Sequence, residues 1–116
     1  MKLTYGSEIQ RETGIGFGSV HTGIYIGNNK VIHFDGESSS ANSKSDIVKE
    51  STLEEFSEGK NLIVRENPRD DEHARRIVKR AKKIMKDENN KYNGNYGLVF
   101  GKHCQDFTKD CYEVEL

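Results

Sequence analysis

Three residues of this 116-residue chain have side chains suited to covalent catalysis, namely Cys104, His21 and His33. A cysteine thiolate is a strong nucleophile, and a neighbouring imidazole can remove the thiol proton. Both histidines lie in strand-like runs, where an unpaired buried imidazole would cost ~1–3 kcal/mol. These residue types suggest a nucleophile, a base and an orienting group, provided that the fold brings them together.

The two histidines lie in a predicted β-hairpin, with strands at 20–26 and 30–34 around Gly27-Asn28-Asn29. A three-residue loop pairs Gly23 with His33 and places His21 diagonally beside His33 on one face. A two-residue loop would put the histidines on opposite faces. The first register would leave open space at Gly23. We favour it because it collects on the other face Val20, Thr22, Ile24, Ile26, Ile32 and Phe34.

Cys104 follows a predicted strand at 98–100 and is expected to begin a short helix that includes Phe107 and Cys111. The partial positive charge at a helix N-terminus lowers the pKa of a thiol there. Cys111 lies about 10 Å further along the helix, too far for a disulfide. We expect Cys111 to be a buried structural residue, and two free thiols to indicate a reducing compartment such as the cytoplasm.

The remaining segments predict the framework around these residues. An edge strand is expected at 7–10 and a further strand at 61–65, whereas 36–45 is a serine-rich loop. Residues 51–56 carry a capping-box pattern that predicts a short helix. After Pro68, an amphipathic helix of about 16 residues is predicted by the spacing of Ala74, Ile77, Val78, Ala81, Ile84 and Met85.

The polar face of that long helix is strongly basic. It carries Arg75, Arg76, Lys79, Arg80, Lys82, Lys83 and Lys86. A solvated face is the ordinary interpretation, and transient contact with an anionic membrane is the functional alternative. His73, in the charged first turn, is expected to be exposed to solvent.

The length and the net charge of the chain exclude several classes of protein. One domain, spanning residues 1–116, is expected from the length. With 18 Lys and Arg against 19 Asp and Glu, the net charge of −1 argues against a dedicated nucleic-acid partner. Neither a signal peptide nor a membrane span is expected, because no apolar run is long enough.

Two sequence boxes resemble those of the lecithin:retinol acyltransferase-like family, a circularly permuted branch of the NlpC-type papain-like cysteine hydrolases. HTGIYIGNNKVIHF at 21–34 resembles the histidine box, and YGLVFGKHCQDF at 96–107 resembles the cysteine box. The resemblance implies an α+β fold, in which a small antiparallel sheet packs against helices that include the nucleophile-bearing helix.

Carried over by position, the resemblance implies Cys104 as nucleophile, His21 as general base and His33 as the group that orients His21. The chain departs from the family pattern beside the nucleophile. His103 stands where Asn is usual, and Gln105-Asp106 replaces Glu-His. These differences bear on substrate choice and on activity.

The resemblance implies a thiol-dependent hydrolase or acyltransferase that forms an acyl-cysteine from a lipid ester or from an amide or peptide bond. No cofactor or metal is expected for this chemistry. A non-catalytic interaction module of the same fold is one alternative. Another is a zinc site made by His21, His33 and Cys104, since two imidazoles and a thiolate form a known ligand set.

Overall fold

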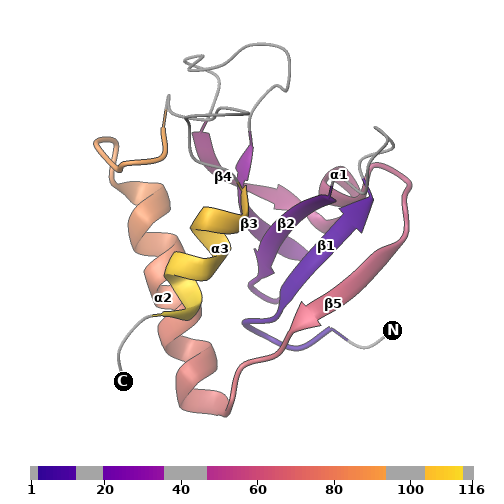
Figure 1. The fold of residues 1–116 in the computed structure, drawn as a ribbon, viewed down its shortest axis with the longest axis horizontal. Coiled ribbons are helices and arrows are strands. Elements are labelled where there is room, and N and C mark those ends of the chain that lie inside the picture. Colours follow the sequence, from indigo (N-terminus) through magenta and orange to yellow (C-terminus); the bar gives the residue numbers. More distant parts are fainter. Residues whose placement is uncertain (1–2, 13–19, 36–46, 94–103, 114–116) are drawn as a thin grey trace.

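The computed structural model describes residues 3–12, 20–35, 47–93 and 104–113. Its five strands are β1 (Glu8–Glu12), β2 (Val20–Tyr25), β3 (Lys30–Asp35), β4 (Ile47–Thr52) and β5 (Leu62–Glu66). Its three helices are α1 (Leu53–Ser57), α2 (Asp71–Lys86) and α3 (Cys104–Tyr112). The strands form one antiparallel sheet in the order β4-β3-β2-β1-β5 (Figure 1). The expected α+β fold, with a small antiparallel sheet and helices, is confirmed.

The β2–β3 hairpin has the three-residue-loop register. Ile24 pairs with Ile32 and Tyr25 with Val31, and the Ile26 N–H donates to the Lys30 carbonyl at 3.0 Å. Asn28 and Asn29 both have positive φ, as a tight hairpin connection requires. Because side chains alternate along a strand, this register puts His21 and His33 on one face.

Two features of the sheet differ from expectation. The predicted edge strand β1 lies inside the sheet, because β5 pairs antiparallel with the side of β1 that β2 leaves free. Strand β4 is absent from the prediction, since its sequence IVKEST has little apolar alternation. It is held along its whole length by pairing with β3.

Each face of the sheet has its own apolar cluster. Helices α2 and α3 lie together on one side (Figure 1), over Ile24, Ile26, Ile32 and Phe34. Helix α1 covers the other side, where Phe56 packs with Ile9 and Val31. The predicted core face of the hairpin is therefore confirmed for the aliphatic residues that the structure describes.

The long helix α2 has the predicted 16 residues. It begins after the N-cap Asp70, whose side chain accepts from the His73 N–H. Its buried stripe contains Ala74, Ile77, Val78, Ala81 and Ile84, which is the face that the spacing predicted. Within the described residues, the structure has no helix with the length and apolar character needed to cross a bilayer.

Candidate active site

His21 and His33 form a buried, hydrogen-bonded pair. The Nε2 atom of His21 lies 2.8 Å from the Nδ1 atom of His33, and their rings meet edge to face with centroids 5.0 Å apart. The Nε2 atom of His33 lies 2.9 Å from the Oγ of Ser51, on β4. Three side chains from three adjacent strands thus form a continuous polar chain that runs from Ser51 through His33 to His21.

Phe56 of α1 covers this imidazole pair. Its ring centroid lies 5.3 Å from that of His21 and 5.2 Å from that of His33, and its side chain is fully buried. The open space expected at Gly23 is filled. A Cβ there would lie 2.6 Å from Cγ1 of Val31 and 3.0 Å from Cε1 of Phe56. Glycine is needed at this position so that the phenyl ring can approach the sheet.

Burial keeps both imidazoles neutral. The pKa of His21 falls well below its ordinary value, mainly by desolvation and secondarily through the neighbouring His33. Desolvation is also the main cause of the lowered pKa of His33, and it outweighs the opposing effect of Asp35. A neutral imidazole has one nitrogen that accepts a proton and one that carries it, so the pair can act as a base and its orienting partner.

Cys104 begins helix α3, as the sequence predicted, and its side chain is buried. Cys111 is fully buried in the core cluster under α2 and α3, and burial raises its pKa. Neither cysteine forms a disulfide. The burial predicted for Cys111 is confirmed.

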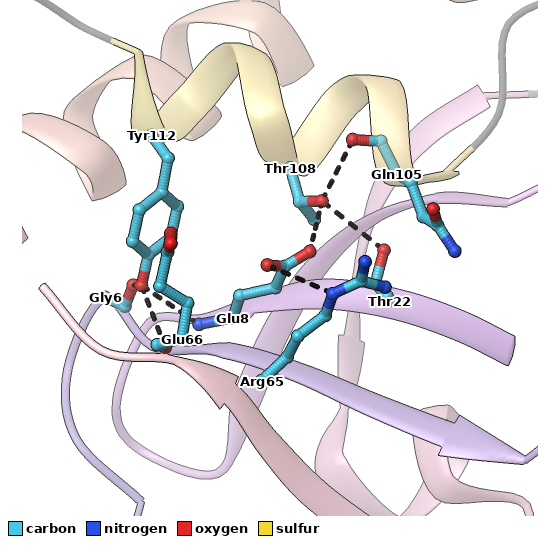
Figure 2. A network of polar contacts seen from close by, with 8 residues as sticks. All are labelled: Gly6, Glu8, Thr22, Arg65, Glu66, Gln105, Thr108 and Tyr112. Carbon is cyan, nitrogen blue, oxygen red and sulfur yellow. Dashed lines mark hydrogen bonds and ion pairs between the residues drawn. The ribbon is translucent and has the colours of Figure 1, made fainter.

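A polar network holds α3 against the sheet (Figure 2). The hydroxyl of Thr108 donates to Oε2 of Glu8 at 2.6 Å and lies 3.4 Å from Oγ1 of Thr22. One turn later, the hydroxyl of Tyr112 accepts from the Glu8 N–H at 3.1 Å and lies 2.7 Å from the Gly6 carbonyl. Burial raises the pKa of Glu8, while the bond from Thr108 opposes this effect.

The network sets the direction of α3. Its C-terminal Tyr112 is fixed at Glu8, which pairs with Ile24 near the end of β2. Thr108 lies at Thr22, one residue after His21. Cys104 is four residues before Thr108, about 6 Å further along the axis in the same direction. The helix therefore directs Cys104 toward the end of β2 that carries His21. Thr22 faces α3, whereas His21 and His33 project to the opposite face of the sheet, against Phe56.

His73 is buried rather than exposed, which corrects the expectation for this residue. Its Nδ1 accepts from the Arg69 N–H at 3.0 Å, and its Nε2 lies 3.4 Å from the carbonyl of Tyr112. It is one turn before Ile77 on the buried stripe of α2. That helical spacing was a signal for burial, but the charged residues beside His73 led to the expectation that it is exposed.

One group of described residues has metal-ligand geometry, namely His21, His33 and Asp35, whose ligand atoms lie within 4.8 Å of one another. Two nitrogens on a tetrahedral zinc would lie about 3.3 Å apart, since each Zn–N bond is about 2.0–2.1 Å. The observed 2.8 Å is instead a hydrogen-bond distance. Asp35 is paired with Lys49 at 2.9 Å. This arrangement fits a hydrogen-bonded pair better than a ready metal site.

Ser51 and Phe56 belong to the site but were not recognised as functional from the sequence. Both lie in the 51–56 segment, which the capping-box pattern marked only as the start of a short helix. That capping box is present, with Thr52 accepting from the Glu55 N–H at 3.1 Å. Without the pairing of β4 with β3, no sequence signal placed this corner beside the histidines.

The comparisons with known proteins bear on this geometry. The sequence model of the family described as lecithin retinol acyltransferase matches residues 3–115, nearly the whole chain. The chain belongs to the lecithin retinol acyltransferase family. Membership supports acyl transfer or thiol-dependent hydrolysis in general, with a lipid or ester substrate. A search of curated proteins found no match.

This lecithin retinol acyltransferase family chain differs from the family's usual cysteine box on both sides of Cys104. His103 and the predicted strand at 98–100 lie outside the described residues. Gln105 and Asp106 lie on the first turn of α3 and are exposed. The substitution of the usual Glu-His pair therefore changes the surface beside the thiol and leaves the buried face of α3 unaltered, namely Cys104, Phe107, Thr108 and Cys111.

Proposed function

We propose that this protein is a thiol-dependent hydrolase or acyltransferase in which Cys104 is the nucleophile, His21 the general base and His33 the group that orients His21. The observation that carries the proposal is the buried His21–His33 hydrogen bond of 2.8 Å. It is supported by the position of Cys104 at the start of α3 and by family membership.

The proposed reaction has two halves. Nδ1 of His21 takes the thiol proton, and Sγ of Cys104 attacks the substrate carbonyl carbon. As the tetrahedral intermediate collapses, the C–O or C–N bond breaks and the leaving group receives that proton from His21. Water or another acceptor then loses a proton to His21 and attacks the thioester, which releases the acyl group and restores the thiol. Backbone N–H groups at the start of α3 are suited to stabilise the oxyanion.

The proposed substrates are a lipid ester and an amide or peptide, because both present a carbonyl to the same thiol. A direct test incubates the protein with p-nitrophenyl acetate and follows nitrophenolate release and acetyl attachment by mass spectrometry. We expect acetylation of Cys104 in the wild type and in Cys111→Ala, and none in Cys104→Ala. Acetylation that is equal in Cys104→Ala would overturn the proposal and favour an interaction module of the same fold.

The outer face of α2 supports a second, accessory proposal of transient contact with an anionic membrane. Lys79, Lys82 and Lys83 are exposed there, and a groove of about 450 Å³ is lined only by cationic side chains, namely Arg76, Lys79, Arg80 and Lys83. Clustered cations attract anionic lipid at moderate ionic strength.

Vesicle co-sedimentation tests this contact. We expect binding to vesicles that contain phosphatidylserine, loss of binding in high salt, and loss in a Lys79→Glu, Lys82→Glu, Lys83→Glu variant. Equal binding to pure phosphatidylcholine vesicles would contradict the proposal. Because neither cysteine forms a disulfide, we also propose that the protein works in a reducing compartment such as the cytoplasm.

A further inference from the structure

The corner between β4 and α1 forms the wall behind the imidazole pair. Ser51 lies opposite Val31 in the β3–β4 pairing, and His33 lies opposite Lys49. Ser51 is therefore the diagonal neighbour of His33 on the same face, close enough for its Oγ to lie 2.9 Å from Nε2. Its side chain is buried. Nothing in the nucleophile, base and orienting roles described above assigns a task to this hydroxyl.

The proton positions along the hydrogen-bonded series Ser51–His33–His21 are linked. Each neutral imidazole carries one N–H, so the donor in one hydrogen bond determines the donor in the next. When His33 donates through Nε2 to Ser51, its Nδ1 must accept from Nε2 of His21. Nδ1 of His21 then has a free lone pair and can take a proton from a thiol.

The opposite arrangement disables the base. When Ser51 donates to Nε2 of His33, the proton of His33 is on Nδ1 and is donated to Nε2 of His21. His21 then carries its own proton on Nδ1 and cannot remove one from Cys104. The direction of the Ser51–His33 hydrogen bond thus determines whether the pair is competent.

We infer that Ser51 is a positioning residue that accepts a hydrogen bond from Nε2 of His33 and thereby selects the His21 tautomer with an unprotonated Nδ1. This inference deepens the proposed function and rests on it for its catalytic consequence. The tautomer itself is a property of the folded protein and can be observed without any substrate.

The surroundings of the pair support a fixed arrangement. Phe56, five residues after Ser51, packs against both rings, and both histidines are buried. Arg11 of β1 donates to the carbonyl of Phe56 and lies over its ring at 5.5 Å, which ties α1 to the sheet. The charged groups that act on the histidines are Arg11, Asp35, Lys49 and Glu55. Ser51 is a neutral hydroxyl, so its removal leaves this charge set intact.

The first experiment determines the tautomers by long-range ¹H–¹⁵N correlation spectra of the imidazoles, in a Cys104→Ala background so that the thiol has no influence. We expect the Nε2–H form for both histidines. Ser51→Ala should shift His21 toward the Nδ1–H form about tenfold, the equivalent of one hydrogen bond. Ser51→Thr, which keeps the hydroxyl, should restore the original spectrum.

The matched control is Ser57→Ala, which removes a hydroxyl from the same corner. The hydroxyl of Ser57 donates to the Glu54 carbonyl, also on α1, at 3.1 Å, and we expect no change in the tautomers. An Nδ1–H form of His21 in the reference protein would overturn the inference. So would a Ser51→Ala spectrum identical to that of Ser57→Ala.

The second experiment measures Cys104 acetylation by p-nitrophenyl acetate as a function of pH, with Cys104 present. We expect Ser51→Ala to be about tenfold slower, with the loss restored by Ser51→Thr. A rate unchanged in Ser51→Ala contradicts the positioning role. Failure of the proposed function is a separate result, because equal acetylation in Cys104→Ala would refute the nucleophile while the tautomer spectra still decide the role of Ser51.

Discussion

The burial of two neutral histidines makes the stability of this protein sensitive to mild acid. In the unfolded chain each imidazole takes up a proton near its ordinary pKa of 6.5, whereas burial lowers the pKa of His21 to about 3 and that of His33 well below its usual range. Below pH 6.5 the unfolded state therefore binds more protons than the folded state. The free energy of unfolding must decrease as the pH falls through this window.

The size of the effect follows from the same pKa values. Lowering the pH from 7 to 5 should cost about 2 kcal/mol for each imidazole that stays neutral in the folded state. The assay is urea unfolding followed by circular dichroism at both pH values. His33→Gln should be less stable than the wild type at pH 7, but its stability should fall by about 2 kcal/mol less between pH 7 and 5.

The comparison between the two proteins isolates the imidazole. Glu8, whose raised pKa acts in the opposite direction, is present in both and cancels in the difference. The urea m-value should be the same in both proteins, because both expose nearly the same surface on unfolding. Parallel losses of stability in wild type and His33→Gln would refute the argument that burial holds His33 neutral.

Three further substitutions, each measured by urea unfolding, test a close contact, a hydrogen bond and a helix cap. Gly23→Ala should lower the free energy of unfolding by about 1–3 kcal/mol, because its Cβ would meet Val31 at 2.6 Å. Tyr92→Phe should cost about 1–2 kcal/mol, since the Tyr92 hydroxyl donates to Oδ2 of Asp110 at 2.7 Å. Thr52→Ala should cost about 1 kcal/mol by removing the N-cap of α1.

Each of these predictions has a control. Gly23→Ala should cost less in a Val31→Ala background, and additive losses would contradict the proposed clash. Tyr5→Phe, at an exposed position, should change stability by less than about 0.5 kcal/mol; an equal loss in both Tyr variants would argue against the Asp110 bond. Thr52→Ser should retain the cap, and a loss as large as that of Thr52→Ala would contradict the capping role.

Much of the local structure could be predicted because it depends on short-range patterns. The three-residue loop and alternating residues of 20–34 determined the hairpin register, and with it the shared face of His21 and His33. The apolar spacing from Ala74 to Ile84 predicted the length and buried face of α2. Cys104 was correctly expected to begin a helix. In each case the information lies within one short, continuous segment of the chain.

The structural features that could not be predicted from the sequence depend on contacts between distant segments. Strand β4 has no strong strand pattern and is defined by its hydrogen bonds to β3. The interior position of β1 required β5, more than 50 residues later in the chain, to occupy its second edge. His73 is buried because Tyr112, 39 residues later, packs against it.

The sequence alone determined which groups carry chemistry, because residue type fixes what a thiol or an imidazole can do. The tertiary structure decided how they are used. Ser51 and Phe56 come from a corner that only sheet pairing brings to the imidazoles. Their hydrogen bond and burial control the protonation of His33 and His21, because pKa and tautomer depend on the surroundings of a group in space rather than on its neighbours in the chain.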